Sequence, residues 1–86
     1  MKVNNVEIGI LNLSKIQDII TFIQIINKYE GNYMLQHDNV EVEAKSIMGI
    51  YSLNLEEDVS LVAKKAKASE IQKLTEALKE ANLLKN

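Results

Sequence analysis

Two short stretches of alternating hydropathy, joined by only two residues, constrain this chain most strongly. Residues 32–37 and 40–44 both alternate, and the second stretch carries acidic residues on its outer side. Asp38 and Asn39 tolerate positive φ, so the pair suits a two-residue hairpin turn. A hairpin this tight joins neighbouring antiparallel strands. At least part of the chain is therefore expected to form an antiparallel sheet.

Two other segments show the same alternation and predict two more strands. The first starts near Val3 and continues through Ile10. The second covers Val59 to Ala63 and is followed by a polar segment that contains Lys64, Lys65 and Lys67.

Two longer segments have helical periodicity, and each follows a Ser-x-x-Gln capping-box sequence. The first box starts at Ser14 and predicts a helix that stops around Lys28, before Gly31. The second box starts at Ser69. The apolar residues of the first helix form two stripes, Ile16, Ile19, Ile20, Ile23 and Ile26 on one and Phe22, Ile25 and Tyr29 on the other. Those of the second helix are Ile71, Leu74, Leu78 and Ala81, with Leu83 and Leu84 near a frayed end.

A third, short helix is predicted over residues 47–53. Ser46 suits its N-cap, because the hydroxyl oxygen can accept a hydrogen bond from the first turn, and Asn54 suits its C-terminal cap. Some of its apolar residues should face solvent or a partner, because a short helix buries only one stripe. They are Ile47, Met48, Ile50, Tyr51 and Leu53.

The predicted order of elements is βαββαβα. Because helices and strands do not alternate strictly and one link is a tight hairpin, we expect an α+β fold. Its four-stranded antiparallel sheet would carry the helices on one face. The 86 residues fit a single domain spanning residues 1–86.

Composition narrows the classes of function. The chain has no cysteine, which excludes disulfides, thiolate metal sites and a cysteine nucleophile. The net charge is -2, and all ten cationic residues are lysine, so neither the charge nor the residue type favours nucleic acid. No apolar run is long enough to span a membrane, and the first residues lack the apolar core of a signal peptide. We therefore expect a cytoplasmic protein.

The sequence supports neither an enzyme nor a metal or cofactor site. Glu56-Glu57-Asp58 is interpreted as a solvated turn, and Lys64-Lys65 with Lys67 as a solvated edge. His37, the only histidine, is interpreted as an exposed or edge-strand residue, since a lone histidine makes a poor metal site without nearby ligands.

The segment around Ser46 also carries a family resemblance. Lys45-Ser46-Ile47-Met48-Gly49, followed by Ser52-Leu53, resembles the regulatory-serine segment of HPr, the histidine-containing phosphocarrier of the bacterial phosphoenolpyruvate–sugar phosphotransferase system. Lys28-Tyr29 and Leu35 match the family at unchanged spacing. The resemblance extends over nearly the whole chain and implies an open-faced β-sandwich, in which three helices cover one side of four antiparallel strands.

The resemblance fails at the family's phosphoryl-carrying site. Family members have Gly-(Ile/Leu)-His-Ala-Arg-Pro at the start of the first helix. In this chain Lys15 occupies the position of the phosphorylated histidine, Gln17 that of the arginine and Asp18 that of the proline. A protonated lysine has no lone pair with which to accept a phosphoryl group, and Asp18 would repel one. Family glycines are also replaced, by Asn54, Asp58 and Lys67.

What the resemblance still implies is a regulatory protein without carrier activity. In relatives, an ATP-dependent HPr kinase/phosphorylase phosphorylates the serine matched by Ser46, and the product binds a catabolite-control transcription regulator. The arginine matched by Gln17 contributes to both contacts. Relatives dock enzyme I and other phosphotransferase-system proteins through positions matched here by Ile20, Ile47, Met48 and Tyr51.

Four interpretations remain open. Ser46 is either a phosphorylated switch, assisted by the adjacent Lys45, or only a helix cap. In the third interpretation, the chain is a diverged protein-interaction module that needs no phosphorylation. A homodimer is one version of this interpretation. A carrier in sugar uptake with an unusual phosphoryl acceptor is the fourth, and it is disfavoured by the loss of the histidine.

Overall fold

The computed structural model describes residues 2–53 and 57–85 and contains strands and helices in mixed order. The strands are β1 (Lys2–Leu11), β2 (Asn32–His37), β3 (Val40–Glu43), β4 (Ser60–Lys67) and β5 (Leu84–Lys85). The helices are α1 (Ile16–Ile26), α2 (Ile47–Tyr51) and α3 (Ala68–Glu80). None of the helices in these ranges has both the length and the hydropathy required to cross a lipid bilayer.

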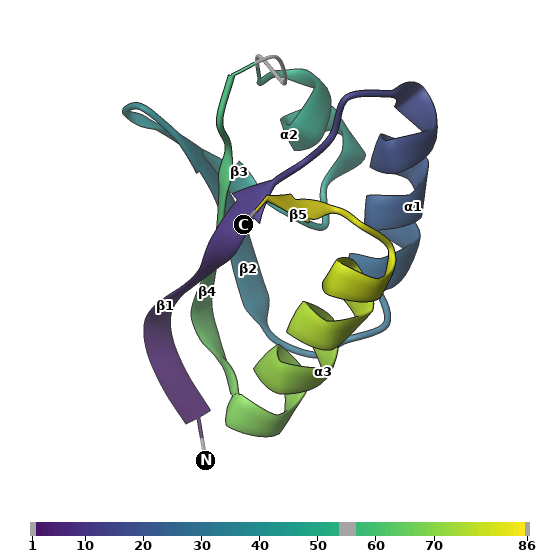
Figure 1. Cartoon of the computed structure of the whole chain (residues 1–86). Helices are drawn as coiled ribbons and strands as arrows, with labels where there is room; N and C mark the ends of the chain where they lie inside the picture. The colour runs from purple at the N-terminus through teal and green to yellow at the C-terminus, as the bar shows by residue number, and fades with distance from the viewer. Residues whose placement is uncertain (1, 54–56, 86) are drawn as a thin grey trace.

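The strands form one sheet in the order β3-β2-β4-β1-β5. Every pair of neighbours among them is antiparallel. The three helices lie together on one side of this sheet (Figure 1). The predicted α+β class is therefore confirmed.

The sheet has five strands, whereas the sequence predicts four. The additional strand β5 pairs with the end of β1, with Leu84 opposite Leu11. The predicted frayed helical end at Leu84 is wrong, because α3 ends at Glu80 and Asn82 adopts a left-handed conformation with φ 60°. The amide of Leu83 then donates to the Leu78 carbonyl at 2.9 Å, which closes the helix and turns the chain back toward the sheet.

The two longer helices do not use their predicted serine caps. α1 has Lys15 rather than Ser14 at its N-cap position and ends at Ile26, slightly before the predicted end. α3 begins at Ala68, because β4 stays paired with β1 up to Lys67 and the chain turns directly from strand into helix. Ser69 therefore lies inside the first turn instead of capping it.

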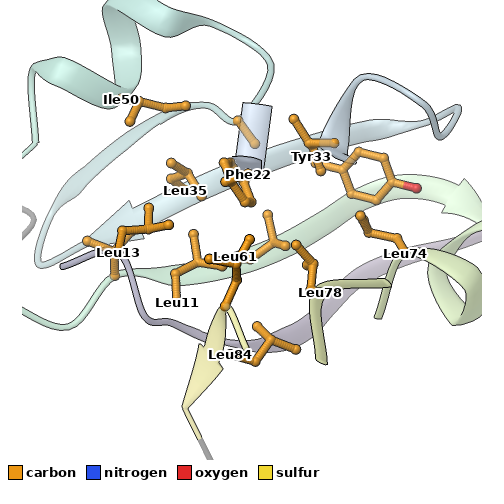
Figure 2. Packing of buried hydrophobic residues seen from close by; sticks show 14 of the residues in the cluster. Leu11, Leu13, Phe22, Tyr33, Leu35, Ile50, Leu61, Leu74, Leu78 and Leu84 are labelled. Carbon is orange, nitrogen blue, oxygen red and sulfur yellow. The ribbon is translucent and has the colours of Figure 1, made fainter. Parts of the chain in front are cut away.

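The core lies between the helices and the sheet (Figure 2). The buried face of α1 takes residues from both predicted stripes, namely Ile19, Phe22 and Ile26. Ile16 and Ile20 are exposed, so the isoleucine stripe is not the buried face as a whole. A helix that lies on a sheet buries only one side of its surface. Which side faces the sheet depends on how the helix packs.

The hairpin and the short helix follow the sequence pattern closely. β2 pairs with β3 through His37 opposite Val40, and Asp38 takes positive φ at 52° in the turn. α2 ends at Tyr51, two residues before the predicted end, and Leu53 is still buried. The predicted cap at Asn54 lies outside the described residues.

Candidate functional site

The N-terminus of α2 is the part of the candidate site that the sequence predicts best. Ser46 has an extended backbone, and its Oγ accepts a hydrogen bond from the Gly49 amide at 3.2 Å. This contact satisfies one of the free N–H groups of the first turn. The predicted N-cap role of Ser46 is confirmed, and its half-buried side chain remains at the edge of the exposed surface.

Lys45 does not direct its charge at Ser46. Its Nζ donates to the Tyr29 carbonyl at 2.7 Å and lies 5.6 Å from the centre of the Tyr33 ring. These contacts hold the ammonium against the segment between α1 and β2. Lys45 would have to leave them before it could assist a phosphate on Ser46.

An exposed apolar surface lies beside Ser46, and we call it the α1–α2 patch. The side chains predicted from the sequence are exposed by 41% for Ile20, 50% for Ile47, 79% for Met48 and 55% for Tyr51. Ile16 is 71% exposed and lines one groove together with Tyr51, so we include it in this surface. Ile50 is the residue that α2 buries, so the helix anchors itself through one side chain and exposes the others.

A groove of about 550 Å³ joins the start of α1 to the end of α2. Its walls include Leu13, Lys15 and Ile16 on one side and Tyr51 and Leu53 on the other. Lys15, which the resemblance aligns with the phosphorylated histidine of HPr, therefore lines this groove. Its charged group is a lysine ammonium, which is not a phosphoryl acceptor while protonated.

A carboxylate already occupies the start of α1. The Asp18 Oδ2 accepts hydrogen bonds at 3.2 Å from the backbone amides of Ser14 and Lys15 and from the Ser14 hydroxyl. Lysine has no acceptor for the reciprocal bond, so only one half of a capping box forms at this end. The negative charge of Asp18 opposes an anion where the resemblance implies a phosphoryl group. Gln17 is exposed and bonds Thr21 at 3.4 Å.

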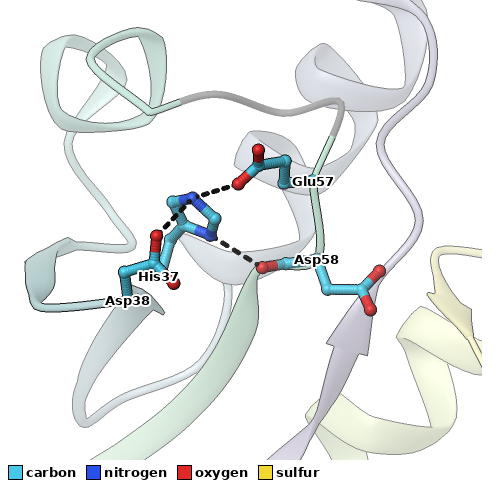
Figure 3. A network of polar contacts seen from close by, with 4 residues as sticks. All are labelled: His37, Asp38, Glu57 and Asp58. Carbon is cyan, nitrogen blue, oxygen red and sulfur yellow. Dashed lines mark hydrogen bonds and ion pairs between the residues drawn. The ribbon is translucent and has the colours of Figure 1, made fainter.

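His37 differs most from the prediction. It lies at the end of β2, which pairs with both β3 and β4 and is therefore not an edge strand. Its side chain is only 16% exposed. The Nδ1 is 3.1 Å from the Asp58 carbonyl, and the Nε2 is 2.7 Å from the Glu57 carboxylate and 3.4 Å from that of Asp38 (Figure 3).

The predicted solvated turn and lysine edge therefore include specific contacts. Asp58 pairs with Lys85 at 2.9 Å, in addition to the contact of Glu57 with His37. Lys64 pairs with Glu41 at 3.0 Å, and this bond lowers the pKa of Glu41. Glu56 lies outside the described residues. The sequence did not predict the His37 contacts, because Asp38 was assigned to the hairpin turn and Glu57 and Asp58 to a separate acidic turn. Only the tertiary structure brings these two turns together.

The contacts of His37 predict a pH-dependent stability. The hydrogen bond to the Asp58 carbonyl, helped by the nearby Asp38 and Glu57 carboxylates, raises the pKa of His37 above 6.5 although partial burial lowers it. Protonation therefore stabilises the fold fully below about pH 6.5, and this contribution is lost as the pH rises through the folded pKa.

Urea unfolding at a series of pH values, in buffer with EDTA, tests this expectation. The wild type should lose stability relative to His37→Gln across that window, because glutamine does not titrate. The single histidine also permits a direct NMR titration of the ring. A folded midpoint at or below 6.5 would contradict the prediction.

Comparison with known protein families, curated proteins and solved structures found no match for this chain.

Proposed function

We propose that this chain is an HPr-like regulatory protein that does not carry a phosphoryl group on histidine and is switched by phosphorylation of Ser46. The observation that carries the proposal is the arrangement of the Lys45–Leu53 segment. Its serine stands at the start of a short helix, and the exposed apolar side chains of that helix begin at the next residue. A phosphate there would add negative charge directly beside the α1–α2 patch.

The arrangement of the sheet supports the family assignment. Four strands lie in the order β3-β2-β4-β1, with antiparallel neighbours, and the three helices cover one face. This agrees with the open-faced sandwich that the resemblance implies. The short strand β5 extends the sheet at the β1 edge.

The start of α1 favours regulation over phosphoryl transfer. A lysine takes the place of the nucleophilic imidazole, and the Asp18 carboxylate accepts the amide hydrogen bonds at this end of the helix. His37 is engaged by the segment before β4, on a different part of the chain. A working carrier would give an acid-labile phosphate after incubation with phosphoenolpyruvate and enzyme I, and we expect none.

The α1–α2 patch is the proposed partner surface. It joins the side chains matched to the family's docking positions, Ile20, Ile47, Met48 and Tyr51, to the additional Ile16. Clustered apolar residues on a small protein favour a protein partner, and methionine adapts to different partner surfaces. The proposed partners are an HPr kinase/phosphorylase, a catabolite-control regulator or another phosphotransferase-system protein.

Intact mass measured after incubation with ATP and an HPr kinase from a Gram-positive bacterium tests the switch. We expect one phosphate on the wild type and none on Ser46→Ala. Ser52→Ala is the matched control, because Ser52 is exposed at the other end of α2 and its loss leaves Ser46 intact. Ser46→Ala should also lower the free energy of unfolding by about 1 kcal/mol through loss of the cap.

Gln17→Arg separates a lost switch from a kinase that requires the family arginine. If the kinase phosphorylates neither this variant nor the wild type, while it phosphorylates its own HPr, Ser46 is only a cap. The exposed patch then favours the interaction module, and sedimentation at high protein concentration distinguishes a homodimer from a monomer.

A further inference from the structure

Three side chains that are not part of the proposed switch converge where β2 ends. His37 comes from the strand itself, Asp38 from the hairpin turn and Glu57 from the segment before β4 (Figure 3). One potential ligand atom from each side chain lies within 4.8 Å of the others. The convergence is tertiary, since Glu57 is twenty positions further along the chain than His37.

The orientation of the His37 ring suits a metal ligand. A carbonyl oxygen only accepts hydrogen bonds, so the 3.1 Å contact with Asp58 assigns a proton to Nδ1. In the neutral ring, Nε2 then carries the lone pair, and it is Nε2 that faces the two carboxylates. Metal-binding histidines generally use one ring nitrogen as ligand while the other donates to a carbonyl or carboxylate, which fixes the ring.

One of the two distances from Nε2 matches a tetrahedral zinc site, and the other is shorter. With ligands about 2.0–2.1 Å from the ion, neighbouring ligand atoms stand about 3.3 Å apart. The Nε2–Oδ2 distance to Asp38 is 3.4 Å and already fits. The Nε2–Oε2 distance to Glu57 is 2.7 Å, so this carboxylate must retreat by about 0.6 Å to admit the ion. Its side chain is 57% exposed and has room to move.

We propose that His37, Asp38 and Glu57 bind one zinc ion, with water in the fourth position. One imidazole nitrogen and two carboxylate oxygens form a donor set that zinc accepts. The two carboxylates balance the charge of the ion, whereas the Asp58 carboxylate points away from the ring and bonds Lys85. The bound ion ties the β2–β3 hairpin to the segment before β4.

The test uses the whole chain without a polyhistidine tag, at mildly alkaline pH so that a proton does not compete for Nε2. Zinc chloride is titrated in while NMR follows the carbon-bound protons of the only imidazole. We expect saturable 1:1 binding in calorimetry and a shift of the His37 resonances, both reversed by EDTA. His37→Gln and Glu57→Gln should each weaken zinc binding by at least about tenfold. Mutation of a residue that only orients a metal ligand already costs about this much affinity.

Asp58→Asn is the matched control, because it removes a neighbouring carboxylate but keeps the backbone carbonyl that orients the ring. It should bind zinc as the wild type does. The proposal is overturned if zinc leaves the His37 resonances unchanged, or if Glu57→Gln binds as tightly as the wild type. The wild-type NMR titration shows whether zinc binds at His37 even if a variant does not fold.

Discussion

Phe22→Ala should lower the free energy of unfolding by about 3–5 kcal/mol, the largest loss that we expect from a single truncation in α1. Phe22 is fully buried and lies in the middle of the side chains between α1 and the sheet (Figure 2). Removing its ring takes away buried apolar area and leaves a cavity that close-packed neighbours fill only in part. Urea denaturation of both proteins measures the difference.

Two variants make the measurement specific to this packing. Phe22→Leu keeps most of the buried volume and should cost less than about 1.5 kcal/mol. Ile16→Ala removes an equally apolar side chain that is 71% exposed and should change stability by less than about 0.5 kcal/mol. If Ile16→Ala cost as much as Phe22→Ala, the face of α1 assigned to the core would be wrong.

Gly31→Ala should lower the free energy of unfolding by roughly 2–4 kcal/mol, through backbone strain and a steric clash. Gly31 links α1 to β2 with φ at 134°, a region that side-chain-bearing residues rarely occupy. An added Cβ would lie 2.6 Å from the Ala66 Cβ and 3.0 Å from the Tyr33 ring. Because Ala66 is buried in β4, relief requires movement of the strand or of the turn.

Gly49→Ala is the matched control for this glycine. Gly49 lies inside α2, where alanine is favoured over glycine by about 1 kcal/mol. Its added Cβ would lie 3.2 Å from the Val42 Cβ, a tight contact that offsets part of the gain. We expect a change within about 1 kcal/mol in either direction. Equal losses at Gly31 and Gly49 would contradict the conformation assigned to Gly31.

The candidate site was predictable where its signal is local. Ser46 caps α2 as predicted, because an N-cap depends on a hydroxyl and the few amides that follow it. Ile47, Met48 and Tyr51 are exposed as expected, because a five-residue helix has only one buried stripe. The direction of the Lys45 ammonium was not predictable, since its partner Tyr29 lies sixteen positions away.

The capping-box sequences that start at Ser14 and Ser69 show where local signals fail. At α1 the Asp18 carboxylate accepts from the amides of both Ser14 and Lys15, and the helix begins one residue later than the box implies. At α3 the pairing of β4 with β1 continues to Lys67 and sets where the helix begins. At α1 a competing hydrogen bond replaced the predicted cap, whereas at α3 the helix begins directly after the strand and places Ser69 inside its first turn.

The sequence by itself determined the order of the longer elements, the α+β class, the β2–β3 hairpin and the cap at Ser46. Each depends on periodicity or on contacts a few residues long. Only the tertiary structure decided which arc of α1 is buried, that Leu84 and Lys85 form β5, and that Glu57 meets His37. These features depend on segments far apart in the chain, so their energies arise only once helices and strands pack together.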